Sequence, residues 1–317
     1  MSGNQKKYLI QSFIFFLVLS IRITGFSQDF IPLWPEGKKP NFNGNTVTDS
    51  LFNERIWRVG TPGFYSFLVP QAENKGTSVL ICPGGGYERL SYIYNGFQLA
   101  KWFNVLGINA FVLIYRLPHQ KDLIQKELAP LQDAQRAVRL IRMHATQWNL
   151  VPDKIGVLGV SAGGHVASML GTHFEDVSSI KDAAAAFDYR ANFMILISPV
   201  ISMGPFSHPG SKKYFLGADT SRTMIEKYSN ELQVSSSTPP TFMIHAQNDS
   251  TVNVKNSLLF YNALIEKKVP ASIHVFPQGG HNIKLSDNPG STALWPELLV
   301  QWMIEKGFLP QTKPAVK

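Results

Sequence analysis

The stretch that decides the fold is IGVLGVSAGGH, residues 155–165. Its first, apolar half predicts a buried strand, and the residues after Ser161 predict the start of a helix. The glycines on either side of Ser161 carry no Cβ that would collide with strand or helix, so the serine can adopt a strained backbone with its hydroxyl exposed at the end of a sheet. The pattern indicates a nucleophile elbow. The alternative, a chance run of glycines in an ordinary turn, has to be weighed against the rest of the chain.

Apolar runs typical of buried strands alternate along the chain with segments of helical spacing. The expected strands are Phe64–Val69, Thr77–Cys82, Ile108–Tyr115, Ile155–Val160, Phe193–Ile197, Thr241–Ala246 and Ser272–Phe276. The expected helices are Asn95–Leu106, Pro130–Trp148, Gly164–Leu170, Asn253–Lys267 and Leu294–Lys306. This alternation, without an internal repeat, predicts an α/β fold with a mostly parallel, doubly wound sheet and helices on both faces. In such sheets the site lies beyond the carboxyl ends of the strands.

Two segments stand apart from this alternation. Residues 28–70 begin rich in Pro, Asn and Gly and predict an extended entry segment. Residues 200–240 mix Gly, Pro, Ser and aromatic residues around one expected helix at 221–232. The second segment is too short for a separate domain, so we interpret it as an insertion that covers the site within a single catalytic domain of residues 28–317.

Residues 1–27 have the pattern of a secretory signal peptide. Lys6 and Lys7 precede a short apolar run, and small residues end at Ser27, which predicts cleavage before Gln28 and export to the periplasm or beyond. A membrane anchor is the alternative, but the apolar run is short against the roughly 20 residues that a spanning helix needs. No cysteine lies near the cut, so the pattern does not favour a lipoprotein, and we expect no stable membrane anchor.

Charge and cysteine content narrow the function classes. The formal net charge is +8, of which Lys6, Lys7 and Arg22 supply three, so the remainder carries +8 − 3 = +5. The basic residues are scattered, which argues against a nucleic-acid partner. The single cysteine, Cys82, excludes an internal disulfide and is expected to be a buried thiol at a strand end. The histidines show no metal-ligand spacing, so we expect neither a metal site nor a cofactor.

A serine hydroxyl is a weak nucleophile that needs a base, and the base needs an acid to orient it. Asp249 follows the strand that ends at Ala246, and His281 follows the strand that ends at Phe276. The order Ser161, Asp249, His281 is the one expected for an elbow on this kind of sheet. A turn or helix cap is the alternative role for Asp249, and Asp287 lies too close after His281 to serve as its strand-end partner.

Two further histidines are expected to pack inside the protein. His165 lies on the helix that follows the elbow, with no acid nearby in the sequence, and His245 lies within a predicted strand. Neither is expected to be the base.

The glycines of PGGGY, residues 83–87, directly follow the Cys82 strand. Consecutive N–H groups without intervening side chains can approach a substrate closely. Gly85 and Gly86, with the N–H of Ala162, therefore predict an oxyanion hole. A phosphate-binding loop is excluded because no Lys-Ser or Lys-Thr follows the glycines.

These residues resemble the α/β-hydrolase superfamily over nearly the whole chain after residue 27. More narrowly, the chain is similar to secreted bacterial esterases related to acetylxylan and feruloyl esterases. The motifs that carry the resemblance are CPGGGY (82–87), YRLP (115–118), GVSAGGH (159–165) and GH (280–281). The resemblance implies Ser161 as nucleophile, Asp249 and His281 as its partners, and Gly85, Gly86 and Ala162 as oxyanion donors. It differs at Pro83, which stands where the larger group has a histidine that braces the loop.

The resemblance implies a serine carboxylic-ester hydrolase that removes acetyl or feruloyl groups from a plant polysaccharide such as xylan, without a cofactor. Tyr87, Arg89 and Tyr214 are candidate contacts for this small-molecule or polysaccharide ester. The rings of Trp34 and Trp57 are further candidates for stacking on sugars, with ordinary packing as the alternative for each ring. A serine peptidase of the same fold and a non-catalytic carbohydrate-binding relative are the competing functions; the complete set Ser161, Asp249 and His281 argues against the latter.

Overall fold

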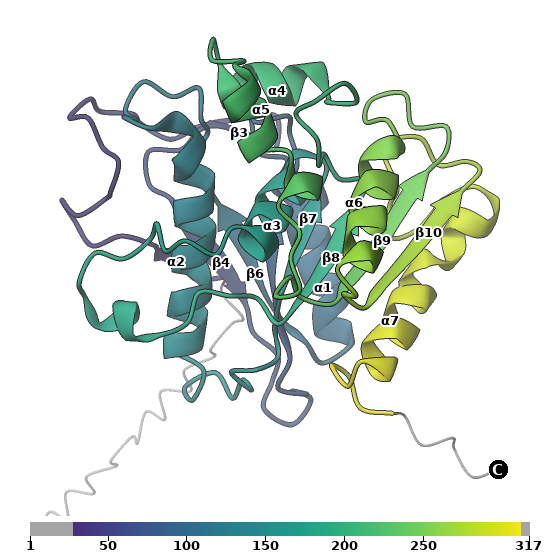
Figure 1. Ribbon diagram of the computed structural model, residues 1–317. Coiled ribbons are helices and arrows are strands. Elements are labelled where there is room, and N and C mark those ends of the chain that lie inside the picture. Colours follow the sequence, from purple (N-terminus) through teal and green to yellow (C-terminus); the bar gives the residue numbers. More distant parts are fainter. Residues whose placement is uncertain (1–27, 312–317) are drawn as a thin grey trace, which may run out of the picture.

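Eight strands form one central sheet in the computed structural model, which describes residues 28–311 (Figure 1). The strands are β1 (Phe30–Pro32), β4 (Gly63–Phe67), β5 (Ser78–Cys82), β6 (Asn109–Ile114), β7 (Ile155–Val160), β8 (Phe193–Ile197), β9 (Thr241–Ala246) and β10 (Ala271–Phe276). They are arranged in the order β1-β4-β6-β5-β7-β8-β9-β10. Pairing is antiparallel from β1 through β4 to β6 and parallel from β6 to β10. The predicted, mostly parallel sheet is confirmed.

Helices cover both faces of the sheet, each over its own apolar core. One face packs against α2 (Ala129–Met143), α3 (Ala162–Thr172) and α6 (Lys255–Glu266). The other packs against α1 (Gln98–Val105) and α7 (Trp295–Glu305). Completely buried strands between two helical layers explain why β5 to β9 are continuous apolar runs.

Two expected helices differ from the structure by more than two residues at one end. The helix expected over 130–148 ends at Met143, and a series of turns follows up to Asn149, which has a left-handed backbone with φ 52°. The segment expected to begin a helix at Asn95 starts instead with a π-helical turn, η1 (Ile93–Phe97), which leads into α1. Short 3-10 turns, η2 (Lys126–Leu128), η3 (Ala183–Ala186) and η5 (Gly290–Leu294), complete the connections on these layers.

Residues 200–240 hold three short helices, α4 (Pro209–Leu216), α5 (Arg222–Lys227) and η4 (Asn230–Leu232), where we expected one. The expected helix over 221–232 is broken after Lys227. The missed helix, α4, begins at Pro209, where a missing N–H costs nothing, and its first turn is capped by the His208 side chain. Figure 1 shows α4 beyond the carboxyl ends of the strands.

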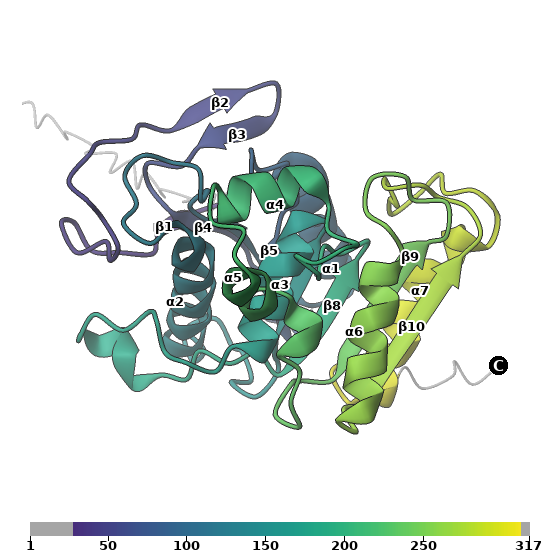
Figure 2. The same ribbon diagram turned by 45° about the horizontal axis from the view of Figure 1, so that its top comes forward.

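The entry segment contains a hairpin that the sequence did not predict. Strands β2 (Ser50–Phe52) and β3 (Arg55–Arg58) pair antiparallel and project from the body beside α4 (Figure 2). Reciprocal main-chain hydrogen bonds of 3.0 and 2.8 Å join Ile56 to Leu90 and attach the hairpin to the segment after the glycine loop. The hairpin thereby lies at the same end of the sheet as the elbow.

The predicted signal peptide, residues 1–27, lies outside the residues that the structure describes. Within residues 28–311, no helix has both the length and the apolar character needed to cross a membrane.

Candidate active site

Ser161 lies between β7 and α3 with φ 54° and ψ −121°, a conformation that side-chain-bearing residues rarely adopt. The neighbouring glycines make this turn possible. A Cβ on Gly159 would lie 2.2 Å from the carbonyl oxygen of Gly163, and a Cβ on Gly163 would lie 2.0 Å from that of Cys82. The turn therefore requires glycine at both positions, and the structure has the strand–turn–helix that the motif predicts.

The structure brings Ser161, His281 and Asp249 into one hydrogen-bonded line. The Ser161 Oγ lies 2.9 Å from His281 Nε2, and His281 Nδ1 lies 2.8 Å from Asp249 Oδ2. Ser161 and Asp249 are each 8% exposed, whereas the imidazole between them is partly open to solvent. This is the geometry in which an imidazole can take the serine proton.

Asp249 is both a turn cap and the partner of His281. Its Oδ1 accepts the N–H groups of Thr251 and Val252, each at 2.9 Å, and its Oδ2 faces His281. Burial favours the neutral acid, but hydrogen bonds from His245, His281 and the Val252 N–H outweigh it and hold the pKa of Asp249 well below its usual range. The Asp249 carboxylate therefore stays ionised and can accept the hydrogen bond from His281 throughout the reaction.

His245 contacts the same carboxylate from within the core. The ring is fully buried on β9, as the sequence predicts for a packed histidine. Its Nε2 lies 3.2 Å from Asp249 Oδ2 and 3.0 Å from the Val252 carbonyl, and its Nδ1 lies 2.8 Å from Ser257 Oγ. An Nε2–H tautomer, accepting from Ser257, satisfies all three contacts. The sequence did not predict this link; the available signal was a histidine one residue before the end of the strand that the acid follows.

Gly85 and Gly86 line a cavity of about 340 Å³ together with Ser161 and His281. Both have left-handed backbones, with φ 137° and 67°. Within the described chain, the N–H groups of Gly85, Gly86 and Ala162 make no hydrogen bond. They are thus available to a ligand at the serine, the arrangement an oxyanion requires.

Tyr87 does not face this cavity. Its ring is completely buried and its hydroxyl lies 2.8 Å from His165 Nδ1, so the expected substrate contact at Tyr87 is not supported. His165 Nε2 in turn lies 2.8 Å from the Tyr228 carbonyl. Burial lowers the pKa of His165 to about 3, so the ring is neutral, donating from Nε2 and accepting the Tyr87 hydroxyl. This link fastens the glycine loop to α3, where Pro83 offers no bracing side chain.

Arg89 and Tyr214 do line the cavity. The Tyr214 hydroxyl donates to Glu88 at 2.9 Å, and the second Glu88 oxygen pairs with Arg89. The Arg89 guanidinium also lies 4.9 Å from the Trp57 ring centre, so one face of Trp57 is already covered. Trp34 is buried and donates to Asp133, which excludes it as a stacking surface.

The structure adds His208, which the sequence analysis missed. Its Nδ1 accepts the N–H of Ser211 at 3.1 Å and so caps α4, while the ring lines the cavity with Ser161. Burial and the nearby His281 lower the pKa of His208, so a neutral ring carries its proton on Nε2. A side-chain donor is thus present at the cavity in addition to the three main-chain N–H groups.

Cys82 takes no part in this chemistry. The side chain is fully buried, and burial raises the pKa of the thiol far above its usual value.

Comparison with known proteins assigns the chain to a family. Residues 67–264 match the model of the BD-FAE family. Endo-1,4-beta-xylanase B of Butyrivibrio fibrisolvens is 36% identical over 83% of this chain and 43% of its own length. The acetylxylan esterase of Xylanibacter ruminicola is 36% identical over 65% of this chain and 41% of its own. The chain thus spans about two fifths of the length of these curated relatives.

A solved structure supports the same placement. The acetyl ester-xyloside bifunctional hydrolase from Caldicellulosiruptor lactoaceticus superposes with a TM-score of 0.77 at 36% identity, covering 89% of this chain and 97% of that one. The fold is that of the α/β-hydrolases, as the sequence predicts. On the matched family model and this similarity, the chain belongs to the BD-FAE family.

Proposed function

We propose that this protein is a serine carboxylic-ester hydrolase that acts through an acyl-enzyme. The observation that carries the proposal is the line from Asp249 through His281 to Ser161, which ends beside three unused N–H groups. A packing role alone does not account for a strained serine whose hydroxyl faces an imidazole at 2.9 Å.

The first half of the reaction forms the acyl-enzyme. His281 Nε2 takes the Ser161 proton while Oγ bonds to the ester carbonyl carbon. The carbonyl oxygen becomes an oxyanion and accepts the N–H groups of Gly85, Gly86 and Ala162. When the intermediate collapses, His281 gives its proton to the departing alcohol oxygen.

The second half releases the acid. His281 takes a proton from water, the hydroxide attacks the acyl carbon, and the bond to Oγ breaks as His281 returns the proton to Ser161. Throughout, Asp249 holds the Nδ1–H tautomer of His281 and stabilises the cation that forms.

We propose acetyl groups on xylan as the substrate, with feruloyl groups as the second candidate. Support comes from the names of the relatives, an acetylxylan esterase and a xylanase that share 36% identity with this chain. The proposed export of the chain fits a polymeric substrate outside the cytoplasm, and the helices of residues 200–240, which bring His208 and Tyr214 to the cavity, are the proposed cover of the site.

We do not extend xyloside cleavage, named for the C. lactoaceticus protein, to this chain. Most glycosidases need two carboxyl groups on either side of the bond, about 5 to 9.5 Å apart. Among the residues that line the Ser161 cavity, Glu88 is the one carboxylate, and it is engaged by Arg89 and Tyr214.

The test compares acetate and ferulate release from acetylated xylan, feruloylated arabinoxylan and acetylated pectin. Ser161→Ala should lower kcat by a factor on the order of 10⁶. Ser236→Ala, at an exposed serine far along the chain, is the matched control. Cleavage of p-nitrophenyl acetate without release of acetate or ferulate from any polymer would support the esterase activity and contradict the proposed polysaccharide substrate.

Two assays separate the competing functions. A prolyl-nitroanilide cleaved faster than p-nitrophenyl acetate would indicate a peptidase. No labelling of Ser161 by a fluorophosphonate probe would indicate a non-catalytic relative.

A further inference from the structure

A second cavity, of about 360 Å³, lies directly beside the one that contains Ser161. Six residues line both cavities and join them: Arg55, Ser91, Asn95, Val160, Asn282 and Ile283. Val160 immediately precedes the serine, so a substrate whose ester is at Ser161 can place a neighbouring group in the second cavity. This space belongs to neither the triad nor the oxyanion donors.

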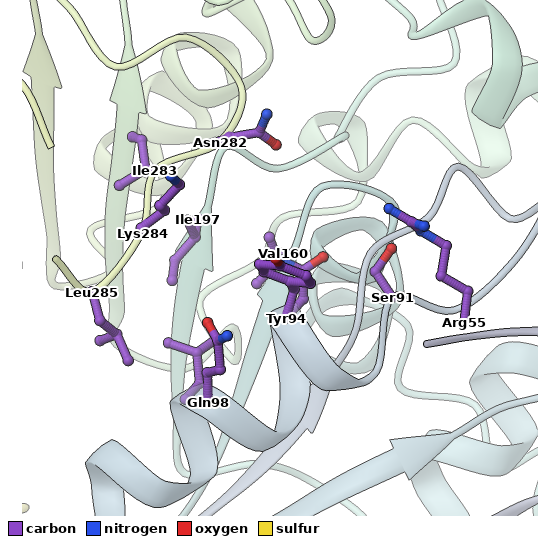
Figure 3. Close-up of a pocket in the computed structure, with 12 residues that line it drawn as sticks. Arg55, Ser91, Tyr94, Gln98, Val160, Ile197, Asn282, Ile283, Lys284 and Leu285 are labelled. Atoms are coloured by element: carbon purple, nitrogen blue, oxygen red, sulfur yellow. The ribbon is translucent and has the colours of Figure 1, made fainter. Parts of the chain in front are cut away.

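The charged side chains that line the second cavity are all basic. Arg55 and Lys284 line it, and its lining contains no Asp or Glu. Figure 3 shows these two side chains on opposite sides of the cavity, with Val160 and Tyr94 between them. Two cations without a carboxylate raise the local concentration of anions and favour their binding.

Neither cation is neutralised by the described part of the chain. The Arg55 guanidinium donates to the Asn53 carbonyl at 3.3 Å and forms no ion pair there, and Lys284 Nζ likewise has no acidic partner within residues 28–311. Arg89, in the neighbouring Ser161 cavity, differs because its charge is paired with that of Glu88. The positive charge available to a ligand is therefore that of Arg55 and Lys284.

Both cations are carried by well-fastened main chain. Arg55 begins β3, which the Ile56–Leu90 hydrogen bonds hold to the body. The main chain of Lys284 exchanges hydrogen bonds of 2.9 and 2.7 Å with the Asn288 side chain, and its carbonyl accepts the buried Trp295 indole N–H at 2.5 Å. Fixed backbones at both sides limit the ordering that ligand binding requires.

The rest of the lining suits a sugar. Hydroxyl and amide groups are supplied by Ser91, Tyr94, Asn95, Gln98 and Asn282, and apolar side chains by Leu99, Val160, Ile197, Ile283 and Leu285. Sugars present hydroxyl groups at their edges and C–H groups on their faces, so this mixture matches them better than it matches a simple inorganic anion.

We propose that this cavity is a subsite for a carboxylate-bearing sugar, a uronic acid substituent carried by the saccharide whose ester is cleaved at Ser161. Arg55 and Lys284 contact the carboxylate, and the amide side chains contact the hydroxyl groups. The inference rests on the proposed ester hydrolysis and adds its substrate class: acidic rather than neutral acetylated xylan.

The test uses two acetylated xylo-oligosaccharides of equal length, one with and one without a uronic acid branch. The quantity measured is the ratio of kcat/KM on the acidic and neutral compounds. The wild type should favour the acidic compound, and Arg55→Gln or Lys284→Gln should each lower the ratio about three- to tenfold, chiefly through KM. The double variant should abolish the preference, and added salt should weaken it in the wild type.

Arg58→Gln on the same strand and Lys101→Gln on α1 are the matched controls, because both side chains are exposed and line neither cavity. They should keep the wild-type ratio. Far-ultraviolet circular dichroism and the unfolding midpoint establish that the Arg55 and Lys284 variants are folded. An equal rate on both compounds in the wild type, or a preference that survives in the double variant, overturns the subsite. If the wild type does not cleave p-nitrophenyl acetate at all, the proposed esterase activity itself is overturned.

Discussion

His245 Nε2 lies 3.2 Å from Asp249 Oδ2, so a buried imidazole contacts the carboxylate that also faces His281. The contact comes from a strand interior, where the ring is fixed by packing and by Ser257. Residues locked in this way position a reacting group more precisely than loop residues do. We therefore assign His245 as a positioning residue for the acid.

Replacing His245 by Leu, which has no donor, should lower kcat about tenfold to a hundredfold, since a hydrogen bond to a charged group is worth roughly 1.5–3 kcal/mol. The loss of a donor should also raise the pKa of Asp249, because the hydrogen bond from His245 helps to lower it. His245→Gln, whose amide can still donate to Asp249, should restore most of the lost kcat.

The control for this variant is His274→Leu on the neighbouring strand β10, where the half-buried ring contacts Ser272 and makes no hydrogen bond to the acid. It should leave kcat unchanged. If His245→Leu lowers only the free energy of unfolding, or if His245→Gln restores none of the lost kcat, the role of His245 is packing alone.

Gly85→Ala should lower kcat by about 10²- to 10³-fold, the cost of one lost oxyanion donor. The added methyl group would lie 2.0 Å from the Arg89 carbonyl oxygen, so the loop has to move and its N–H groups turn away from the oxyanion. Gly307→Ala is the control, because φ there is also left-handed, at 73°, while the space around it is open. Steady-state rates of p-nitrophenyl acetate cleavage measure the difference. Equal losses in the two variants would mean that backbone strain, not the donor, is responsible.

Stability should fall as the pH drops from 6.5 toward 3. The pKa of the buried His165 is lowered to about 3, so the folded state keeps this ring neutral while the unfolded chain takes up a proton below its usual value near 6.5. The stabilisation is complete above pH 6.5 and declines by about 1.4 kcal/mol for each pH unit over that window.

Urea unfolding at pH 7.5, 6, 5 and 4 measures this slope. In His165→Gln the amide can still accept from Tyr87 and donate to the Tyr228 carbonyl, but it does not titrate. The slope of the free energy of unfolding against pH should therefore be smaller in this variant by the contribution of about one proton. A slope identical to that of the wild type would contradict a neutral, buried His165.

The sheet and the triad could be predicted because their signals are local. A buried parallel strand is a continuous apolar run, and β5, β7, β8 and β9 lie where those runs lie. The order of Ser161, Asp249 and His281 follows from strand ends that meet at one edge. Helix α4 was missed because Pro209 and Gly210 resemble a loop, although proline is favoured in a first turn.

The contacts of single side chains could not be predicted, since they depend on three-dimensional packing. The position of Tyr87 after the glycine loop predicts a substrate contact, yet its left-handed backbone, with φ 62°, accompanies a ring buried against His165. The charge of the second cavity joins Arg55 of a hairpin to Lys284 of a loop more than 200 residues later in the sequence. No spacing in the sequence links such residues.

His208 caps α4 through Nδ1 and its ring lines the Ser161 cavity, so we expect Nε2 to donate to the substrate, and substitution can separate the two roles. His208→Asn keeps an acceptor for the first turn of α4 but shortens the side chain, so stability should stay within about 0.5 kcal/mol. The cavity loses a donor, and kcat/KM on acetylated xylo-oligosaccharides should fall about tenfold.

His208→Ala is the companion variant. It removes the cap as well and should cost about 1 kcal/mol in the free energy of unfolding, with a loss in kcat/KM similar to that of His208→Asn. Urea unfolding and steady-state rates on the same preparations distinguish the two effects. If activity follows stability across the two variants, His208 is only a cap. If both variants lose activity equally while only His208→Ala loses stability, the ring acts on the substrate. The reason is that the cap survives in His208→Asn, whereas the donor survives in neither variant.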